Sequence, residues 1–416
     1  MRYFFKLIFS FLILLSFSTA KADTIKWLHL FGEDDNSYPN MVKAAKEFEE
    51  KTGHTVVLQY LENESFKAKL PTMLQSDDRP DIFYSWGGGV MYDQAKAGFL
   101  RDISSVVPDS YLETVSAAAA DAFTYEGQRV GLPKQVAQVA WWYNKDLISQ
   151  AGVDVSKIQM WDDLLSAVKQ IKDAGITPIC MGGKDKWPVH FIWTHLHIRN
   201  GGKALFLESL NNGGWDRPEY IKSGEQMLEL VALDPFQKGW LAATWPDQAG
   251  FFGDGKCAMA FMGNWMYGAQ AANSASGEGL GDDNMGMFNM PMTAGGLGNP
   301  GDTLGGINGW LFSSSAPDSA VELMMHYVSK EIQTEDASIG AYIPIVKGAD
   351  AALENPFLQQ VAKSIANSEY HQIFYDQFLG ADIGRVVNDV STDLAAGIIT
   401  AEEATLAVQE AWEFNQ

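Results

Sequence analysis

Alternating strand and helix patterns follow residue 22 and constrain the fold more than any other feature of this sequence. Runs rich in apolar and β-branched residues recur, and each is followed by a helical pattern that ends near a glycine or a turn. The strand patterns are Thr24–Phe31, His54–Leu61 and Asp81–Trp86, and the helical patterns lie near 41–53, 64–75 and 92–98. This alternation predicts an α/β fold with a mainly parallel sheet.

The same kind of pattern restarts after the run Arg129–Asn144. Trp161–Ala174 has the apolar spacing of a helix, and the stretches Ile176–Met181 and Lys256–Trp265 are predicted strands. The end of the chain is predicted to be helical, and Thr400 with Glu403 has the spacing of a capping box. The 394 residues from 23 to 416 exceed what one hydrophobic core usually serves, so we expect two domains.

The first 22 residues have the pattern of a secretory signal peptide. Arg2 and Lys6 precede an apolar run, which ends in the small-residue exit Ala20–Ala22. The alternative is an N-terminal membrane anchor, but the apolar run is short for a spanning helix. We therefore expect cleavage after Ala22. No cysteine stands at the exit for lipid attachment, so the mature chain is expected free in a bacterial periplasm.

The charge balance excludes two classes of partner. The chain has 30 Lys plus Arg against 52 Asp plus Glu, a formal net charge of −22, and loss of the three basic residues of the leader makes it −25. Such a surface repels phosphate backbones and anionic lipids. Neither nucleic acid nor direct membrane insertion of the mature chain is expected.

The two cysteines, Cys180 and Cys257, both lie in short apolar runs. In an oxidising compartment they form one disulfide, or else they are two buried free thiols. The sequence leaves both alternatives open.

A run of three glycines, Gly87–Gly89, follows the third predicted strand. It is not a phosphate loop, because VMYDQ follows Gly89 where that motif needs lysine. It is not a dinucleotide fingerprint either, because residue 92 is tyrosine where that spacing needs glycine. Ligands bind outside the carboxyl ends of parallel strands, so the run would let a ligand approach the main chain beside Trp86. The alternative is a tight turn that requires positive φ.

An acidic turn follows the first predicted strand. Glu33, Asp34, Asp35 and Asn36 are suited to accept hydrogen bonds from a neutral polyol. They are equally suited to cap the helix that follows.

The motifs of common enzyme classes are absent from the sequence. His190, His195 and His197 lack the HExxH arrangement and are expected to be packing or surface residues, and no GxSxG occurs. Two carboxylates are the core of glycosidase chemistry, but 52 acidic residues guarantee some pair. A secreted carbohydrate-active hydrolase therefore stays only an alternative.

Several segments, in this order, resemble one protein family. They are AKEFEEKTGHTV, PDIFYSW, GLPKQVAQVAWWYNKDL, MWDDLLSAVKQIKDAGITPI, FGDGKCAMAFMGNW, GGINGWLFSSSAPDSAVELMMHYVS and IITAEEATLAVQEAW. Together they resemble the extracellular solute-binding proteins of family 1, the periplasmic sugar receptors of ABC importers. The resemblance extends over essentially the whole mature chain.

The resemblance implies a periplasmic-binding-protein-like type II fold, with two α/β lobes, a multi-crossing hinge and a ligand cleft between the lobes. The implied N-terminal lobe is 23–134 with 290–335, and the C-terminal lobe is 135–289 with 336–416. Crossings are expected at Gln135–Gln138, near 287–290 and near 334–342.

It also implies a receptor that captures a sugar by lobe closure, without catalysis, and delivers it to membrane permease subunits. A disaccharide or short oligosaccharide is the preferred ligand, and a monosaccharide is the alternative. A receptor of the same fold for a metal, polyamine or carboxylate is a further alternative. We expect a monomer with no cofactor and no metal.

The positions that match the family's binding site give a candidate set. Trp265, after the strand CAMAFMGN, is the strongest candidate and matches the stacking aromatic of the family. The full set is Asp34, Asp35, Asn36, Trp86, Gly87, Gly88, Gln135, Gln138, Trp187, Trp265, Gly306, Asn308, Asp382 and Arg385.

Overall fold

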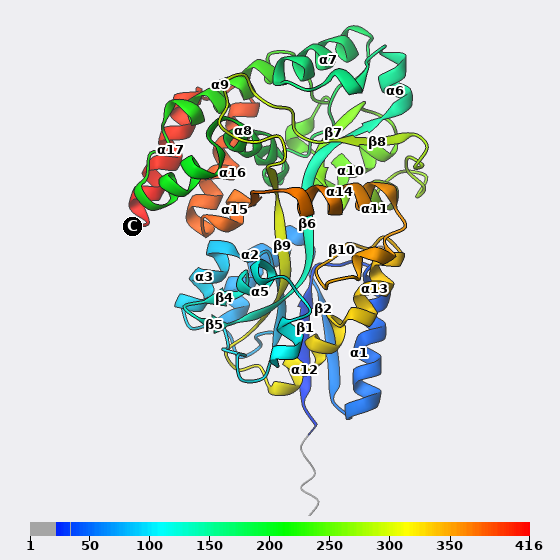
Figure 1. Cartoon of the computed structure of the whole chain (residues 1–416), viewed down its shortest axis with the longest axis vertical. Helices are drawn as coiled ribbons and strands as arrows, with labels where there is room; N and C mark the ends of the chain where they lie inside the picture. Colours follow the sequence, from blue (N-terminus) through cyan, green and yellow to red (C-terminus); the bar gives the residue numbers. More distant parts are fainter. Residues whose placement is uncertain (1–21, 34) are drawn as a thin grey trace, which may run out of the picture.

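The computed structural model describes residues 22–33 and 35–416. The predicted signal peptide, up to residue 21, and Asp34 lie outside the described residues. Figure 1 shows two lobes, one above the other, with two long strands running between them.

The lower lobe holds most of the first 130 residues and a later segment. Its elements are β1 (Thr24–His29), α1 (Tyr38–Thr52), β2 (Thr55–Tyr60), α2 (Asn63–Leu74), β3 (Ile82–Ser85), α3 (Gly88–Lys96), α4 (Asp109–Leu112), α5 (Ala117–Asp121), β4 (Thr124–Tyr125), β5 (Gln128–Arg129), α12 (Asp318–Tyr327) and α13 (Lys330–Ser338). Trp27, Phe83 and Trp310 are fully buried in the core of this lobe.

The upper lobe has its own core, in which Trp141, Trp193 and Phe261 are fully buried. Its elements are α6 (Lys145–Gln150), α7 (Trp161–Asp173), α8 (Trp187–Asn212), α9 (Pro218–Val231), α10 (Trp245–Gly253), β7 (Met259–Gly263), α11 (Met266–Ala272), β8 (Met285–Phe288), α14 (Pro356–Asn367), β11 (His371–Ile373), α15 (Tyr375–Phe378), α16 (Ala381–Ala395) and α17 (Ala401–Phe414). Short 3-10 turns lie at Val155–Lys157, Trp240–Ala242 and Asp350–Ala352.

Two strands, β6 (Gly131–Asn144) and β9 (Thr303–Phe312), connect the lobes. On β6, Leu132 lies in the lower core and Val139 in the upper core, and on β9 Leu304 lies in the upper core and Trp310 in the lower. The short strand β10 (Ile343–Pro344) pairs with β6 at Gln135 and Val136. Along β9 the buried side chains pass from the upper core to the lower core. This passage lies later in the chain than residue 290, where the boundary was expected. The lobe boundaries themselves stay a prediction.

The sheet is mixed, although the sequence predicts a mainly parallel one. Its order is β10-β6-β9-β3-β1-β2, and β1 pairs in parallel with both β2 and β3. β9 pairs antiparallel with β3 and with β6, and β6 pairs antiparallel with β7 and β8. The prediction of parallel pairing is therefore correct for β1 with β2 and with β3, and β11 also pairs in parallel with β9, whereas the other pairings of this sheet are antiparallel. The difference arises because β9 enters the lower lobe from the opposite end, after the chain has passed through the upper lobe.

A bulge interrupts the pairing of β6 with β9 at the level of the cleft. The register shifts between Pro133 and Gln135, where proline has no N–H to give to the ladder. Lys134 is fully buried in the lower lobe, whereas Gln135 is half-buried and lines the cleft described below.

Three further findings concern the sequence predictions. Cys180 and Cys257 are joined in a disulfide, which selects one of the two alternatives left open by the sequence. His190, His195 and His197 are all buried in α8, so they are packing rather than surface residues. Within residues 22–33 and 35–416, no helix is long and apolar enough to cross a membrane.

The disulfide connects two segments that already touch, because Ile179 bridges to Met259 and the Cys180 N–H donates to the Met259 carbonyl at 2.9 Å. It closes a loop with a sequence separation of 77 residues. Replacing both cysteines by alanine should lower the free energy of unfolding by about 2–4 kcal/mol, because the unfolded chain regains freedom. Chemical denaturation with and without dithiothreitol measures this. The reductant should destabilise the parent chain and leave the variant unchanged. Equal stability of the parent chain and the variant in the absence of reductant would contradict the prediction.

Candidate functional site

A cavity of about 300 Å³ lies where the lobes meet beside β6 and β9. Both lobes contribute to its walls, so the position of one lobe relative to the other determines its shape. From the lower lobe come Phe31, Asp35, Asn36, Tyr60, Glu62, Asn63, Lys67, Tyr84, Trp86 and, on the connecting strands, Gln135 and Asn308. From the upper lobe come Trp187, Phe191, Trp245, Asn264, Trp265, Gly268, Phe374, Asp376 and Gln377.

Three tryptophans form the upper wall. Trp187 is at the start of α8, Trp245 is at the start of α10, and Trp265 lies between β7 and α11. Their ring centroids are 5.7 Å apart for Trp187–Trp245, 6.4 Å for Trp187–Trp265 and 6.5 Å for Trp245–Trp265. Each ring is thus placed by an element boundary, and the three together present a broad apolar surface to the cavity.

The position of Trp265 depends on the glycine two residues before it. A Cβ atom at Gly263 would overlap the Trp265 indole, so the ring folds back over the end of β7 only because residue 263 has no side chain. The Phe374 ring supports the indole edge-on at 6.0 Å. Trp265 is half-buried, which leaves part of the ring available to a ligand.

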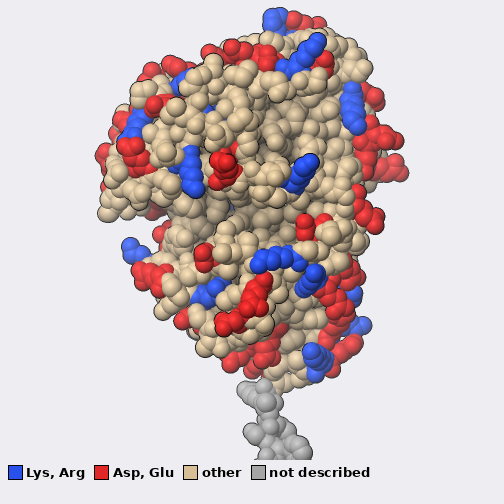
Figure 2. Space-filling view, in the orientation of Figure 1, with Lys and Arg blue, Asp and Glu red and all other residues tan. Residues whose placement is uncertain are grey.

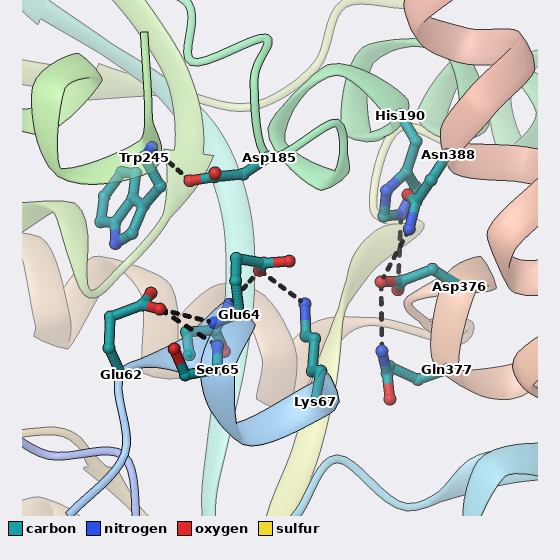
Figure 3. Close-up of polar contacts among 11 residues, drawn as sticks. Glu62, Glu64, Ser65, Lys67, Asp185, His190, Trp245, Asp376, Gln377 and Asn388 are labelled. Carbon is teal, nitrogen blue, oxygen red and sulfur yellow. Dashed lines mark hydrogen bonds and ion pairs between the residues drawn. The ribbon is translucent and has the colours of Figure 1, made fainter. Parts of the chain in front are cut away.

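Trp86 forms the opposite aromatic wall, directly after β3. Tyr84 and Phe66 hold its ring by edge-on contacts, with centroids 5.3 Å and 5.9 Å away. The Lys67 ammonium lies 5.4 Å from the Trp86 centroid and 5.5 Å from the Trp187 centroid, so one cation touches a ring of each lobe. Lys67 also forms an ion pair with Glu64 at 3.3 Å, and Figure 3 shows this pair pointing toward the upper lobe.

Two carboxylates hold the starts of elements that line the cavity. Glu62 caps α2 by accepting from the N–H groups of Glu64 and Ser65 at 3.0 Å and 3.2 Å. Asp185 accepts the Trp245 N–H at 2.7 Å, which fixes the start of α10 (Figure 3). Burial raises the pKa of both Asp185 and Glu64.

Two buried polar groups of the cavity belong to α15. Asp376 is buried and accepts from the Gln377 amide at 3.1 Å and from the Asn388 amide at 3.5 Å. The Nε2 atom of buried His190 lies 3.8 Å from the other carboxylate oxygen, as Figure 3 shows. Burial lowers the pKa of His190, so the ring faces Asp376 in its neutral form. These neighbours hold the carboxylate oxygens in fixed positions.

The acidic turn is also held from within. Asp35 accepts from the N–H of Ser37 at 2.8 Å and from its hydroxyl at 2.5 Å. Lys134 is buried beneath the turn, with its ammonium 4.5 Å from the Phe31 ring and 4.1 Å from the Tyr342 ring. Burial lowers the pKa of Lys134 to about 8, and the charges of Asp336 and Asp35 oppose that shift.

Seven of the residues expected from the sequence line this cavity. They are Asp35, Asn36, Trp86, Gln135, Trp187, Trp265 and Asn308. Asp34 lies outside the described residues. Their contact with a ligand stays a prediction.

Six expected residues do not line the cavity, and three of them are glycines with a packing role. A Cβ atom at Gly88 would lie 2.8 Å from the Phe378 Cα, and Gly87 and Gly88 both have positive φ of 69°. A Cβ atom at Gly306 would lie 2.7 Å from the Asn308 Oδ1 and 2.8 Å from the Phe374 ring. These glycines allow turns and the close approach of chain segments, and their contact with a ligand stays a prediction.

The other three are polar side chains that lie outside the cavity. Gln138 is buried and donates to Asn289 at 3.0 Å. Asp382 and Arg385 are exposed on α16, and Arg385 pairs with Asp389 at 3.1 Å. The resemblance predicted both residues in the binding site, whereas the structure places them on the exposed surface of α16, outside the cavity.

The sequence analysis missed several residues of the cavity. Trp245 had a usable signal, because Thr244 and Asp247 form a capping box that marks the start of α10 at this ring. Lys67 and Asp376 had none, because each reaches the cavity through the packing of segments far apart in the sequence.

The family comparison agrees with the fold. The profile of the bacterial extracellular solute-binding protein family matches residues 33–334, so the chain belongs to this family. An uncharacterized ABC transporter extracellular-binding protein of Pyrococcus horikoshii is 22% identical over 338 residues, which are 79% of this chain and 74% of the relative. A diacetylchitobiose binding protein of Streptomyces coelicolor is 25% identical over 397 residues, 92% of this chain and 88% of the relative.

A solved structure is similar over nearly the whole chain. A chitin oligosaccharide binding protein matches with a TM-score of 0.85 at 23% identity and covers 94% of this chain and 98% of its own. This similarity shows the two-lobed α/β fold. The matched family and these named neighbours are binding proteins.

The buried lysine gives a pH prediction. The pKa of Lys134 is about 8 in the folded chain and near 10.5 when unfolded, so the unfolded chain binds more protons between these values. The free energy of unfolding should therefore rise with pH across that window. Relative to Lys134→Met, the parent chain should gain on the order of 2 kcal/mol between about pH 7.5 and about pH 10 in denaturation curves. Other titrating groups cancel in this difference, and a difference that stays flat would contradict the prediction.

Proposed function

We propose that this member of the bacterial extracellular solute-binding family is the periplasmic carbohydrate receptor of an ABC importer. It captures a sugar between its lobes and passes it to the membrane permease subunits without catalysis. The observation that carries the proposal is the cavity between the lobes, where tryptophans of both lobes face fixed amide and carboxylate groups. The names of the relatives, which bind chitin oligosaccharide and diacetylchitobiose, point to the same ligand class.

The aromatic and the polar parts of the cavity wall match the C–H faces and the hydroxyl groups of a sugar. Pyranose rings present C–H faces that pack on indole rings, and each such ring contributes about 0.5–1.5 kcal/mol beyond area burial. Hydroxyl groups require partners such as Asp376, Gln135 and Asn308, which line the cavity. A buried polar group left without a partner costs about 1–3 kcal/mol, so the pattern of hydroxyls determines which sugar is accepted.

The charges of the cavity favour a neutral ligand over an anionic one. Asp35, Glu62 and Asp376 line it together with one cation, Lys67, which is already paired with Glu64, so a carboxylate ligand would approach an excess of like charges. A carboxylate receptor needs a committed cation, and Arg385, the arginine in the predicted set, lies outside the cavity and pairs with Asp389. Figure 2 shows acidic side chains spread over the visible face of both lobes, so long-range steering of an anion is also unfavourable.

The strand connections support capture by lobe closure. β6, β9 and the segment around β10 pass between the two cores beside the cavity, so rotation about them changes the distance between Trp86 and the upper wall. Closure then excludes water from the sugar and forms the surface that the permease recognises. The mature receptor is expected to begin after Ala22 and to act as a monomer in the periplasm.

Ligand binding can be tested by thermal shift and calorimetry on residues 23–416. Mono-, di- and oligosaccharides are compared with amino acids, polyamines and metal ions. A sugar at a hundred times its Kd should stabilise the protein by roughly 2.7 kcal/mol and raise its melting temperature. In calorimetry, Trp265→Ala should weaken binding of that sugar by about 10–100-fold, because it removes stacking and apolar contact.

Trp412→Ala is the matched control. Trp412 lies on α17 and donates to the Leu210 carbonyl at 3.1 Å, away from the cavity, so its loss should alter stability and leave sugar affinity unchanged. Chromatography of the recovered sugar checks for hydrolysis. A shift with a metal or a charged solute only, or cleavage of the bound sugar, would contradict the proposal.

A further inference from the structure

We propose that Lys186 is a positioning residue of the sugar site, because its strained backbone sets the place of Trp187 in the upper wall. This inference rests on the proposed function and makes it more specific. Lys186 has φ of 62° and ψ of −46°, and the Trp187 N–H donates to the Asp185 carbonyl at 2.7 Å. These values describe a γ-turn with positive φ, which costs free energy in any residue that carries a side chain.

Lys186 is distinguished by its location among the strained residues. Three non-glycine residues of the described chain have positive φ: Glu126, Lys186 and Asp234. Glu126 and Asp234 are exposed and lie outside the cavity. Lys186 directly precedes Trp187, which is buried and lines the cavity. Backbone strain persists only where the surrounding structure holds it, and it gathers at ligand sites, so the turn at residue 186 points to a role in binding.

Trp187 connects the aromatic groups of the site. Its ring contacts Trp245 and Trp265 in the upper wall, with centroids 5.7 Å and 6.4 Å away, and Phe191 at 5.5 Å. The Lys67 ammonium of the lower lobe lies 5.5 Å from the same ring. The Nε1 atom of Trp187 has no hydrogen-bond partner among the described residues. The place of this ring therefore depends on packing and on the backbone that leads into it.

The loop that precedes the turn is fixed to the segment that carries Trp245. The Lys184 N–H donates to the Ala243 carbonyl at 3.0 Å. The Asp185 carboxylate accepts the Trp245 N–H at 2.7 Å (Figure 3). These bonds hold the chain as far as the turn. A change in the conformation of residue 186 therefore moves the indole that follows the turn rather than the loop before it.

The chain after the turn and the Lys186 side chain are held as well. Trp187 and Pro188 begin α8, and the ring of Pro188 fixes φ in the first turn of this helix. The Lys186 carbonyl accepts the Val189 N–H at 2.9 Å, and the Lys186 ammonium pairs with Asp389 of α16 at 2.7 Å. The change of direction between loop and helix is thus confined to residue 186. Its conformation determines where the next ring lies in the upper wall.

The test compares substitutions at residue 186 by isothermal titration calorimetry with diacetylchitobiose, xylobiose and maltose. A β-branched residue does not adopt φ of 62° without strain, so Lys186→Val should shift the turn and displace the Trp187 ring. Binding of the sugar should weaken by about tenfold or more. Glycine adopts positive φ freely, so Lys186→Gly should keep the affinity of the parent protein to within about threefold.

Glu126→Val is the matched control. It places the same side chain at positive φ in an exposed turn outside the cavity. It should lower the melting temperature, as Lys186→Val does, and leave the sugar affinity unchanged. A loss of affinity at residue 186 alone then reports the position of the wall rather than the stability of the fold.

A second readout does not require sugar. Circular dichroism of the coupled indole rings, compared with that of Trp187→Phe, reports whether the Trp187 ring is in place. Lys186→Val should lose the contribution of this ring, whereas Lys186→Gly and Glu126→Val should keep it.

The outcomes separate the two proposals. If none of the sugars in this test or in the wider screen binds the parent protein, both proposals are overturned. If a sugar binds and Lys186→Val keeps the parent affinity or the Trp187 signal, only the positioning role is overturned. The same holds if Lys186→Gly loses as much affinity as Lys186→Val, because the side chain rather than the backbone would then matter.

If Lys186→Val does not fold, Asp185→Ala gives the test. It removes the bond that holds the strained turn to α10, so the turn should relax and sugar affinity should fall severalfold. Adding Lys186→Gly to this variant should restore most of the affinity, because glycine has no strain to release there. An unchanged affinity of Asp185→Ala would overturn the positioning role.

Discussion

The antiparallel pairing of β6 with β9 is the constraint on which the rest of the structure depends. Gly131–Gln138 pairs with Gly305–Leu311, and both strands have buried side chains in both cores. Two separate lobes are therefore joined by a shared ladder rather than by a flexible tether. The cavity lies beside this ladder, where Gln135 and Asn308 face it. The bulge between Pro133 and Gln135 directs Lys134 into the lower core and Gln135 toward the cavity. Consecutive residues thus pack beneath the site and line it.

Sequence analysis could predict those parts of the fold that depend on local pattern. From Thr24 to Trp86, the spacing of apolar residues marks each strand and each helix locally. β1 pairs in parallel with β2 and with β3, as expected from that alternation of strands and helices. The direction of β9 could not be read in this way, because it depends on where the chain returns after the upper lobe. The pairing of Cys180 with Cys257 could not be decided either, because it requires Ile179 to lie beside Met259, which only tertiary structure establishes.

The candidate site shows the same division. The presence of Trp86, Trp187 and Trp265 in the cavity lining could be predicted from the sequence. Each follows a strand or begins a helix, and a large ring at such a position has less reason to be a core residue than one within a helix or strand. The sequence could not show that Gly88 and Gly306 also make room for α15 and for Phe374, because those neighbours come from distant segments. Lys67 contacts tryptophans of both lobes, and no local pattern marks such a residue. Residues that act through shape alone, such as Gly263 beneath Trp265, become recognisable only when the neighbouring ring is placed.

The residues that line the cavity are held by contacts within their own lobe. The distance between the two lobes depends on three chain crossings, at β6, at β9 and near β10. The central claim is that a sugar binds between the two lobes and contacts both. The most direct test is a crystal structure of residues 23–416 grown with the sugar that binds most tightly. The account predicts a sugar ring against Trp265, with hydroxyls in contact with Asp376 on one side and with Gln135 or Asn308 on the other. A sugar bound to the outer surface, or to one lobe alone with the cavity empty, would contradict it.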